Sequence, residues 1–331
     1  MKKRYQNGFF IFGLLVLIIM TTQLDFRQVW QGISQAGYWF VAVVALWGLL
    51  YILNTSAWWV IIKSGQPDGK RVGEKVGFWW LYKVTVSGFA LNYATPGGLM
   101  GGEPYRIMSL SPRIGTERAT SSVLLYVMTH IFSHFWFWLL SCLLYVFTQP
   151  LSVFMVLLLT VISAFCLLAI WFFQKGYKRG IAVSGMNVLS HFPLIKRRVR
   201  PFFERHSEQL SNIDHQIAAL HNQNPRTLFM AVGLELLCRI VSALEIFFIL
   251  LVIMPSANFI QCVLILAFTS LFANMLFFIP LQLGGREGGF LMSVGGLGMT
   301  ASAGIFVALL VRLRELIWTA IGLLLIKVNK R

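Results

Sequence analysis

Eight apolar segments divide the sequence and constrain its fold more than any other feature. Crossing the hydrocarbon core of a bilayer takes about 20 predominantly apolar residues, and several segments approach or exceed that length. The chain of 331 residues is 57% hydrophobic and 12% charged, too apolar for a soluble domain. The sequence therefore predicts an all-α polytopic membrane protein, with residues 1–331 as a single transmembrane domain. The segments run over about 9–22, 38–62, 77–95, 119–147, 151–174, 227–254, 257–281 and 302–327.

Basic residues gather beside these segments and give the chain a net charge of +16. They cluster at 2–4, 63–75 and 175–226, as the positive-inside rule expects for cytoplasmic loops. We therefore expect contact with anionic lipid headgroups at the cytoplasmic face, and no binding of nucleic acid. Apolar residues also recur at helical spacing in the last cluster, which fits either an amphipathic helix on the membrane or ordinary cytoplasmic packing. They are Leu210, Ile213, Ile217 and Leu220.

The basic loop at 175–226 determines the expected topology. It carries nine Lys or Arg residues against three acidic ones, and it would lie outside if all eight segments crossed the membrane. The conflict with the charge rule disappears if 77–110 enters and leaves on the cytoplasmic side and 257–297 re-enters from outside. The sequence then predicts about six transmembrane helices plus two re-entrant broken-helix hairpins. Both termini are expected to be cytoplasmic, in the cell (inner) membrane.

Two of the apolar segments are interrupted by stretches rich in glycine, proline and charge. The first reads NYATPGGLMGGEPYRIMSL over 92–110, and the second reads FFIPLQLGGREGGF over 277–290. Both contain the pattern Pro-x-x-Leu-x-Gly-x-Glu, which begins at Pro96 in one and at Pro280 in the other. Each break lies between two full spans, and the expected topology makes the two units enter from opposite sides. This arrangement predicts an inverted repeat, a common plan of secondary transporters.

A broken helix at membrane depth is tolerated where its backbone lines a polar cavity or is buried in protein. Proline ends the incoming helix, and the restarting helix points its positive dipole end at the gap. Such a gap suits a phosphate, to which Arg106 and Arg286 can donate pairs of hydrogen bonds. Glu103 and Glu287 can orient these arginines or bind a cationic headgroup. The alternative is that the glycines merely permit tight helix packing.

Ten Arg or Glu residues fall within the apolar segments or at their breaks, and the charges of these ten cancel. An isolated charge near the bilayer centre costs about 2.5–3.5 kcal/mol on the insertion scale, so each must pair or face water. Glu235 with Arg239, and Arg312 with Glu315, are spaced to pair within their own helices. Those pairs fit either a structural ion pair or a substrate role. The ten are Arg106, Arg239, Arg286, Arg312, Arg314, Glu103, Glu235, Glu245, Glu287 and Glu315.

The sequence predicts no metal site and no cofactor. His130 and His134 are four residues apart, but no carboxylate nearby in that segment and no clear third ligand completes a metal site. Packing or lining of a lumen is the better interpretation of these histidines. The four cysteines lie in apolar segments without C-x-x-C spacing, which indicates buried free thiols.

At the two breaks the sequence resembles the transmembrane region of the lysylphosphatidylglycerol synthase family, a group of flippase-like integral membrane proteins. The resemblance covers nearly the whole chain. The sequence departs from the second family motif at Leu281 and Gln282, where the family has glycines. The first motif is matched by Asn92, Pro96, Gly97, Gly101, Gly102, Glu103 and Arg106. The second is matched by Pro280, Gly284, Glu287, Gly288 and, in the last helix, Arg312.

The resemblance implies a lipid transporter that moves a phospholipid or lipid-phosphate, such as aminoacylated phosphatidylglycerol, between leaflets without catalysing a reaction. A separate lipid-modifying synthase is an expected partner, because this chain has no room for the soluble transferase domain. Two alternatives stay open: an integral-membrane enzyme with Glu103 or Glu287 as general base, and a non-catalytic scaffold of a lipid-modifying complex. The expected substrate-binding residues are Asn92, Pro96, Gly97, Gly98, Gly101, Gly102, Glu103, Arg106, Pro280, Gly284, Gly285, Arg286, Glu287 and Arg312.

Overall fold

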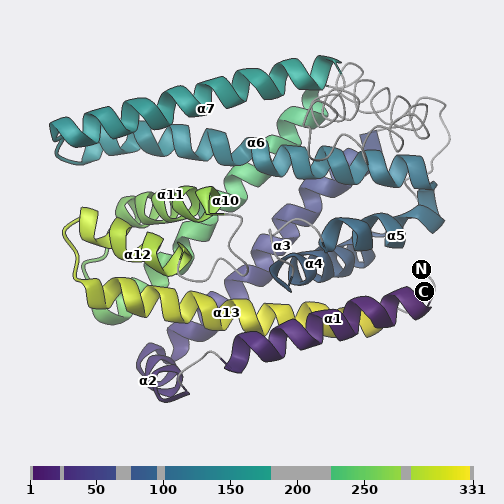
Figure 1. Ribbon diagram of the computed structural model, residues 1–331, viewed down its shortest axis with the longest axis horizontal. Helices are drawn as coiled ribbons and strands as arrows, with labels where there is room; N and C mark the ends of the chain where they lie inside the picture. Colours follow the sequence, from purple (N-terminus) through teal and green to yellow (C-terminus); the bar gives the residue numbers. More distant parts are fainter. Residues whose placement is uncertain are drawn as a thin grey trace, which may run out of the picture.

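The chain is helical throughout the part that the computed structural model describes, which is 3–22, 26–64, 76–94, 101–179, 225–276 and 285–328 (Figure 1). These ranges contain eleven α-helices and no strands, which confirms the all-α fold expected from the sequence. The helices are α1 (Lys3–Thr22), α2 (Phe26–Ala36), α3 (Tyr38–Ser64), α4 (Phe78–Ala94), α5 (Gly102–Ile114), α6 (Thr116–Thr148), α7 (Val153–Arg179), α10 (Pro225–Ile253), α11 (Phe259–Met275), α12 (Gly285–Gly296) and α13 (Ala301–Val328).

Four helices are long and apolar enough to cross a membrane: α3, α6, α7 and α10. Their apolar stretches coincide with four of the six full spans expected from the sequence. Much of the surface of α7 is apolar and exposed, as at Phe154 and Phe172, which suits contact with lipid chains. The protein is therefore a multi-pass membrane protein. Helices α1 and α13 are 20 and 28 residues long, and α13 carries three charged side chains near its centre.

The helices fall into two units with the same order of lengths. In the first unit α3, α4, α5 and α6 have 27, 17, 13 and 33 residues. In the second unit α10, α11, α12 and α13 have 29, 17, 12 and 28 residues. In both units the two short helices pack against each other, and the sequence breaks fall between them. The short helices lie in the middle of the molecule, between α6 and α7 on one side and α1 and α13 on the other (Figure 1).

The two units pack through their first helices, and the second helix of each unit packs on the last helix of the other. Helix α3 crosses α10, α4 packs on α13, and α11 packs on α6. Contacts along α3 and α10 run in opposite order: the rings of Trp39 and Phe248 are 5.4 Å apart, and the Asn54 amide lies 3.3 Å from Cys238 Sγ. Because low-numbered residues of α3 meet high-numbered residues of α10, these corresponding helices are antiparallel.

Each pair of short helices forms the centre of one hydrophobic core. Val84 and Leu91 of α4 and Tyr105 and Leu110 of α5 belong to the larger core, together with residues of α3, α6, α10 and α13. Helices α11 and α12 form the second core with residues of α3, α10 and α13. Burial of these apolar faces holds the four short helices in place, since none of them is long enough to be stable alone.

Close packing between α4 and α13 depends on a glycine. A Cβ atom on Gly322 would lie 2.5 Å from Ala90 Cβ and 2.9 Å from the Val86 carbonyl oxygen. The Ser87 hydroxyl donates a 2.9 Å hydrogen bond to the Gly322 carbonyl. This small-residue contact brings the first unit directly against the last helix.

Residues 26–36 form an amphipathic helix, α2, between the first two expected apolar segments, where the sequence predicted no helix. Its Val29 and Ile33 pack against the second core, while Trp30 stays 72% exposed. Near the other end of α1, Lys327 Nζ lies 4.5 Å from the centre of the Phe10 ring, so the start of α1 and the end of α13 lie together (Figure 1). The amphipathic pattern around 210–220, which fits either a surface helix or ordinary packing, lies outside the described residues.

Candidate functional site

The first break brings the end of α4 against the start of α5. Gly101 precedes α5 and has no side chain to cap it, so Asn92 of α4 performs that role. The Gly102 backbone N–H donates to Asn92 Oδ1 at 2.7 Å, and Asn92 Nδ2 donates to Glu103 Oε1 at 2.9 Å. One side chain therefore satisfies a free N–H at the helix start and fixes the carboxylate beside it.

Two glycines allow α5 to lie directly on α4. A Cβ atom on Gly102 would lie 2.2 Å from the carbonyl oxygen of Gly88, which no real structure tolerates. A Cβ atom on Gly88 would lie 2.4 Å from Arg106 Nε. The absence of both side chains brings the arginine across the backbone of α4.

Arg106 is 1% exposed and lies among aromatic rings. Its Cζ atom is 4.7 Å from the ring centre of Phe89, 5.4 Å from that of Tyr126 and 5.9 Å from that of Trp58. Such rings attract the cation through their electron-rich faces. The hydrogen bond from Arg106 Nη1 to Glu103 Oε1 is long, at 3.4 Å.

Three polar atoms of this group have no hydrogen-bond partner among the described residues: Arg106 Nε, Arg106 Nη2 and Glu103 Oε2. The two nitrogens share one edge of the planar guanidinium, which is the edge that binds a carboxylate or phosphate in bidentate fashion. Leaving buried charged groups without partners costs free energy. The first break thus places two donor nitrogens of Arg106 beside an acceptor oxygen of Glu103, and no described residue bonds to any of the three.

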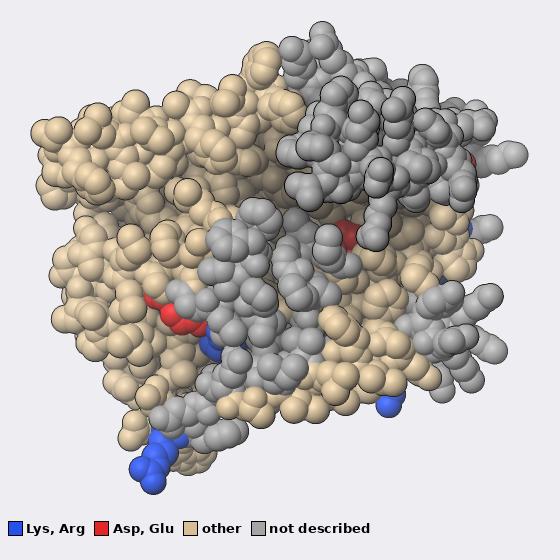
Figure 2. Space-filling view, viewed as in Figure 1, with Lys and Arg blue, Asp and Glu red and all other residues tan. Residues whose placement is uncertain are grey.

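At the second break the charges of α12 pair with α13. Glu287 accepts from Arg312 Nη2 at 2.7 Å, and Arg286 forms an ion pair with Glu315. The Glu287 side chain is 38% exposed, and that of Arg286 is 30% exposed. Figure 2 shows acidic and basic atoms side by side near α12 and α13 on a face that otherwise has few charged atoms.

Arg314 of α13 is neutralised inside the protein. Its Nε and Nη2 donate to the two oxygens of Glu245 on α10 at 2.7 and 2.9 Å. Trp47 of α3 donates to the same carboxylate at 2.9 Å, and its ring lies 3.8 Å from Arg314 Cζ. This bidentate pair joins three helices and has the contacts of a structural ion pair.

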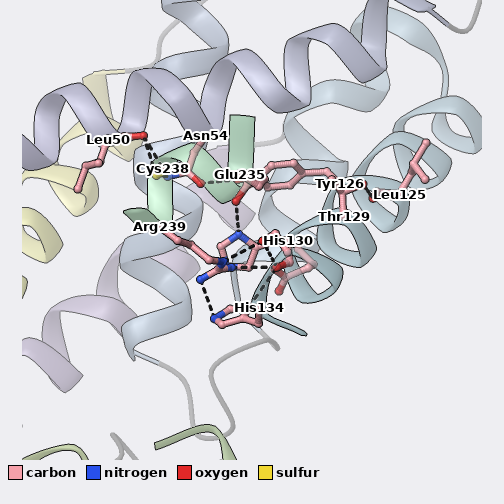
Figure 3. Close-up of polar contacts among 12 residues, drawn as sticks. Leu50, Asn54, Leu125, Tyr126, Thr129, His130, His134, Glu235, Cys238 and Arg239 are labelled. Carbon is pink, nitrogen blue, oxygen red and sulfur yellow. Dashed lines mark hydrogen bonds and ion pairs between the residues drawn. The ribbon is translucent and has the colours of Figure 1, made fainter. Parts of the chain in front are cut away.

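A third polar group lies between α6 and α10 (Figure 3). His130 Nδ1 is 2.7 Å from Glu235 Oε2. Arg239 donates through Nε to Ser133 at 2.8 Å, through Nη1 to His134 Nε2 at 2.7 Å, and through Nη2 to the His130 carbonyl at 2.8 Å. All three nitrogens of this guanidinium are therefore occupied by α6.

A row of aromatic rings connects the polar groups. The Phe89 ring lies beside Arg106 and is 5.9 Å from the His130 ring. It is 5.5 Å from Tyr51, whose ring is 5.7 Å from Trp47, the residue that covers Arg314. The first break, the α6–α10 group and the Arg314 pair thus line one continuous aromatic layer.

The structure brings the sequence-predicted site residues together in two groups. Asn92, Gly102, Glu103 and Arg106, with Gly101 next to them, lie at the first hairpin. Gly285, Arg286 and Glu287 lie at the start of α12, facing Arg312 on α13. The hairpins are connected mainly through α13, which packs on both α4 and α12. Outside the described residues lie Pro96, Gly97, Gly98, Pro280 and Gly284.

The expected pairing within helices is not what the structure shows. Glu235 contacts His130 rather than Arg239, and Arg312 contacts Glu287 rather than Glu315. Neighbours on facing helices offer better geometry than residues stacked along one helix. Sequence reasoning also missed Gly88 and Phe89; a glycine inside an otherwise apolar helical segment was the available signal.

In the described part of the chain, no group of three or more His, Cys, Asp or Glu side chains is arranged to hold a metal ion. His130 and His134 instead serve the contacts with α10. All four cysteines are buried and free: Cys142, Cys166, Cys238 and Cys262.

A comparison with models of known protein families gives one match that covers nearly the whole chain. The family model described as the lysylphosphatidylglycerol synthase TM region matches residues 8–322, nearly the whole chain. No protein of curated function and no solved structure matches the sequence of this chain.

Proposed function

Because the chain belongs to the family of the lysylphosphatidylglycerol synthase TM region, we propose that it is a flippase that moves a phosphate-bearing lipid between leaflets. The observation that carries this proposal is the buried Arg106, whose Nε and Nη2 have no partner among the described residues. A desolvated donor fork at a helix break suits a phosphate headgroup.

The first hairpin also suggests the class of headgroup. Glu103 Oε2, beside the Arg106 fork, is a buried acceptor without a partner among the described residues. A headgroup with both a phosphate and an amine satisfies both, as a zwitterionic or aminoacylated phospholipid does. At the second hairpin, Arg286 and Arg312 are already held by Glu315 and Glu287, so Arg106 is the primary phosphate ligand.

The proposed topology has six spans in the cell (inner) membrane, with hairpins α4–α5 and α11–α12 re-entering from opposite sides as an inverted repeat. Its support is the repeated long–short–short–long order of helices and the antiparallel crossing of α3 and α10. The start of α1 and the end of α13 lie together, which fits two termini on one side. The excess of basic residues supports a cytoplasmic position for that side, with contact to anionic headgroups.

Transport in this scheme needs the first hairpin to open. Arg106 is 1% exposed, so the structure represents a state closed over its guanidinium. The headgroup reaches the fork when α5 separates from α4, while the lipid tails stay in the bilayer. The lipid leaves chemically unchanged, which makes the protein a transporter and not an enzyme, and a separate synthase supplies any modified headgroup.

The test is lipid translocation in proteoliposomes, measured as loss of fluorescence when a membrane-impermeant reductant quenches a labelled phospholipid in the outer leaflet. Arg106→Gln should slow translocation by about tenfold or more, because a charge-assisted pair of hydrogen bonds is worth about 1.5–3 kcal/mol. Arg106→Lys keeps the charge but loses the planar fork, so it should also be impaired.

Arg113→Gln is the matched control, since Arg113 lies on the same helix and stacks on Trp80 at 4.0 Å. Its rate should equal that of the wild type. Wild-type rates in both Arg106 variants, with normal folding, would remove this arginine from the mechanism.

A further inference from the structure

The pair His130–Glu235 is a buried ionisable group that lies outside both breaks. Helix α6 supplies the imidazole and α10 the carboxylate, with 2.7 Å between Nδ1 and Oε2 (Figure 3). The imidazole side chain is 26% exposed, whereas the carboxylate side chain is 1% exposed. Glu235 Oε1 has no hydrogen-bond partner among the described residues. The imidazole nitrogen and the carboxylate oxygen are thus close enough to hold one proton between them.

We propose that His130 and Glu235 together form a proton-binding site that couples lipid movement to proton movement. The site accepts one proton, which rests on the imidazole as an imidazolium–carboxylate pair or on the carboxyl group beside a neutral imidazole. The partly exposed imidazole is the entry point, since the carboxylate behind it is closed off. The coupling rests on the proposed transport function, whereas the proton site itself does not.

The neighbouring cation does not replace the proton. Arg239 stays protonated, and its Nε, Nη1 and Nη2 all donate to groups on α6 rather than to Glu235. Its donation to His134 Nε2 fixes that imidazole as a neutral acceptor with its hydrogen on Nδ1, which faces the His130 carbonyl at 3.2 Å. His134 therefore cannot accept a proton on Nε2 without losing its hydrogen bond from Arg239. His130 and Glu235 remain as the titrating pair.

The neighbouring charged groups determine the net charge around His130 and Glu235 before and after a proton binds. With Glu235 ionised and both histidines neutral, Arg239 balances the carboxylate, so a bound proton adds one positive charge to the group. Helix α3 contributes only the uncharged Asn54, to which the Tyr126 hydroxyl donates at 3.5 Å. The titratable and charged groups that face the pair are Tyr126 and His134 of α6, Cys238 and Arg239 of α10, and Arg106 of α5 with its partner Glu103.

The added charge lies near the proposed phosphate ligand. The ring of Phe89 lies 4.7 Å from Arg106 Cζ and 5.9 Å from the His130 ring, so the two cations occupy neighbouring positions around one side chain. Through this apolar layer, which screens charge poorly, a proton at His130 favours an anion at Arg106. Linkage makes the effect reciprocal, so a bound phosphate also favours the proton. A phosphate lipid and a proton then cross in the same direction.

Direct proton binding is measured on the purified full-length protein in detergent by infrared difference spectroscopy between about pH 5 and about pH 8. The wild type should show a pH-dependent carboxyl band or imidazolium band, and potentiometric titration should show uptake of about one proton more than Glu235→Gln. His130→Gln should lose the imidazolium band and shift the pH at which any carboxyl band appears. Glu117→Gln, which replaces an exposed carboxylate on the same helix α6, is the control and should keep whichever band the wild type shows.

Coupling is measured in proteoliposomes that contain a labelled phospholipid with both a phosphate and an amine in its headgroup, with and without an imposed pH gradient. The gradient should speed wild-type translocation toward the alkaline side, and it should have no effect in Glu235→Gln or His130→Gln. Infrared and titration results identical in wild type and both variants would overturn the proton site. If the bands behave as expected while no lipid moves at all, the transport function fails and the proton site stands. Equal gradient dependence in wild type and variants would overturn the coupling.

Discussion

The Gly102→Ala substitution tests whether the first hairpin depends on the close approach of its two helices. The new Cβ atom would lie 2.2 Å from the Gly88 carbonyl oxygen and 2.6 Å from Asn92 Oδ1. The first of these atoms belongs to the backbone and cannot rotate away. Helix α5 must therefore move outward by about 1 Å to restore ordinary contact distance.

The expected cost follows from that movement. Overpacking of a well-packed interface costs about 1–3 kcal/mol, and the hydrogen bond from Gly102 N–H to Asn92 contributes about 0.5–1.5 kcal/mol. We expect a loss of about 2–4 kcal/mol in the free energy of unfolding, and a Tm lower by about 4–8 °C for a chain of this size. Arg106 moves with α5, so lipid translocation should also fall by about tenfold or more.

The assays are thermal unfolding of the detergent-solubilised protein and translocation in proteoliposomes. Gly233→Ala is the matched control, because a Cβ atom there meets nothing within 4 Å inside helix α10. Alanine should raise stability at that position by about 0.5–1 kcal/mol, since it is the better helix former. A Gly102→Ala protein with the Tm and the translocation rate of the wild type would refute the close-approach reasoning.

Two further predictions concern topology and the buried charges. A cysteine introduced at Arg200 should react only with a thiol reagent applied from the cytoplasmic side. A cysteine introduced within 148–150 should react only with a reagent applied from outside. Labelling of the Arg200 position from outside would exclude the six-span topology. Glu245→Gln should lower the unfolding free energy by about 3–5 kcal/mol, because Arg314 then keeps a buried charge whose nearest carboxylate is Glu315, 3.9 Å away and already paired with Arg286. The same measurement on Glu117→Gln, which replaces an exposed carboxylate, should show almost no change in the unfolding free energy. An equally small effect of Glu245→Gln would contradict a structural role for the Glu245–Arg314 pair.

The sequence located the helix before the first break and the last helix of the chain closely. The apolar segment at 77–95 is helix α4 (Phe78–Ala94), and the segment at 302–327 is helix α13 (Ala301–Val328). Their lengths follow from apolar composition, and their ends follow from glycine, proline and charge, which are local properties. Helix α2 was missed because its 11 residues are too few and too polar to register as a span.

The partners of the buried charges could not be read from the sequence. Glu235 and Arg239 are neighbours on one helix, yet each contacts α6, because the crossing of α6 and α10 places His130 and Ser133 nearer in suitable geometry. Which residues face each other across two helices depends on the rotation of each about its axis. The order of residues along the chain does not determine how each helix is rotated about its axis.

The most direct test of the central claim is the fate of a phospholipid in proteoliposomes that contain the wild-type protein. The lipid is followed simultaneously by its leaflet distribution and, after extraction, by mass spectrometry. The account predicts that the lipid moves between leaflets faster than in protein-free vesicles, with its mass unchanged, and that Arg106→Gln slows this movement by about tenfold or more. A lipid of altered mass, or a leaflet distribution the same as in protein-free vesicles, would contradict a flippase that works through Arg106.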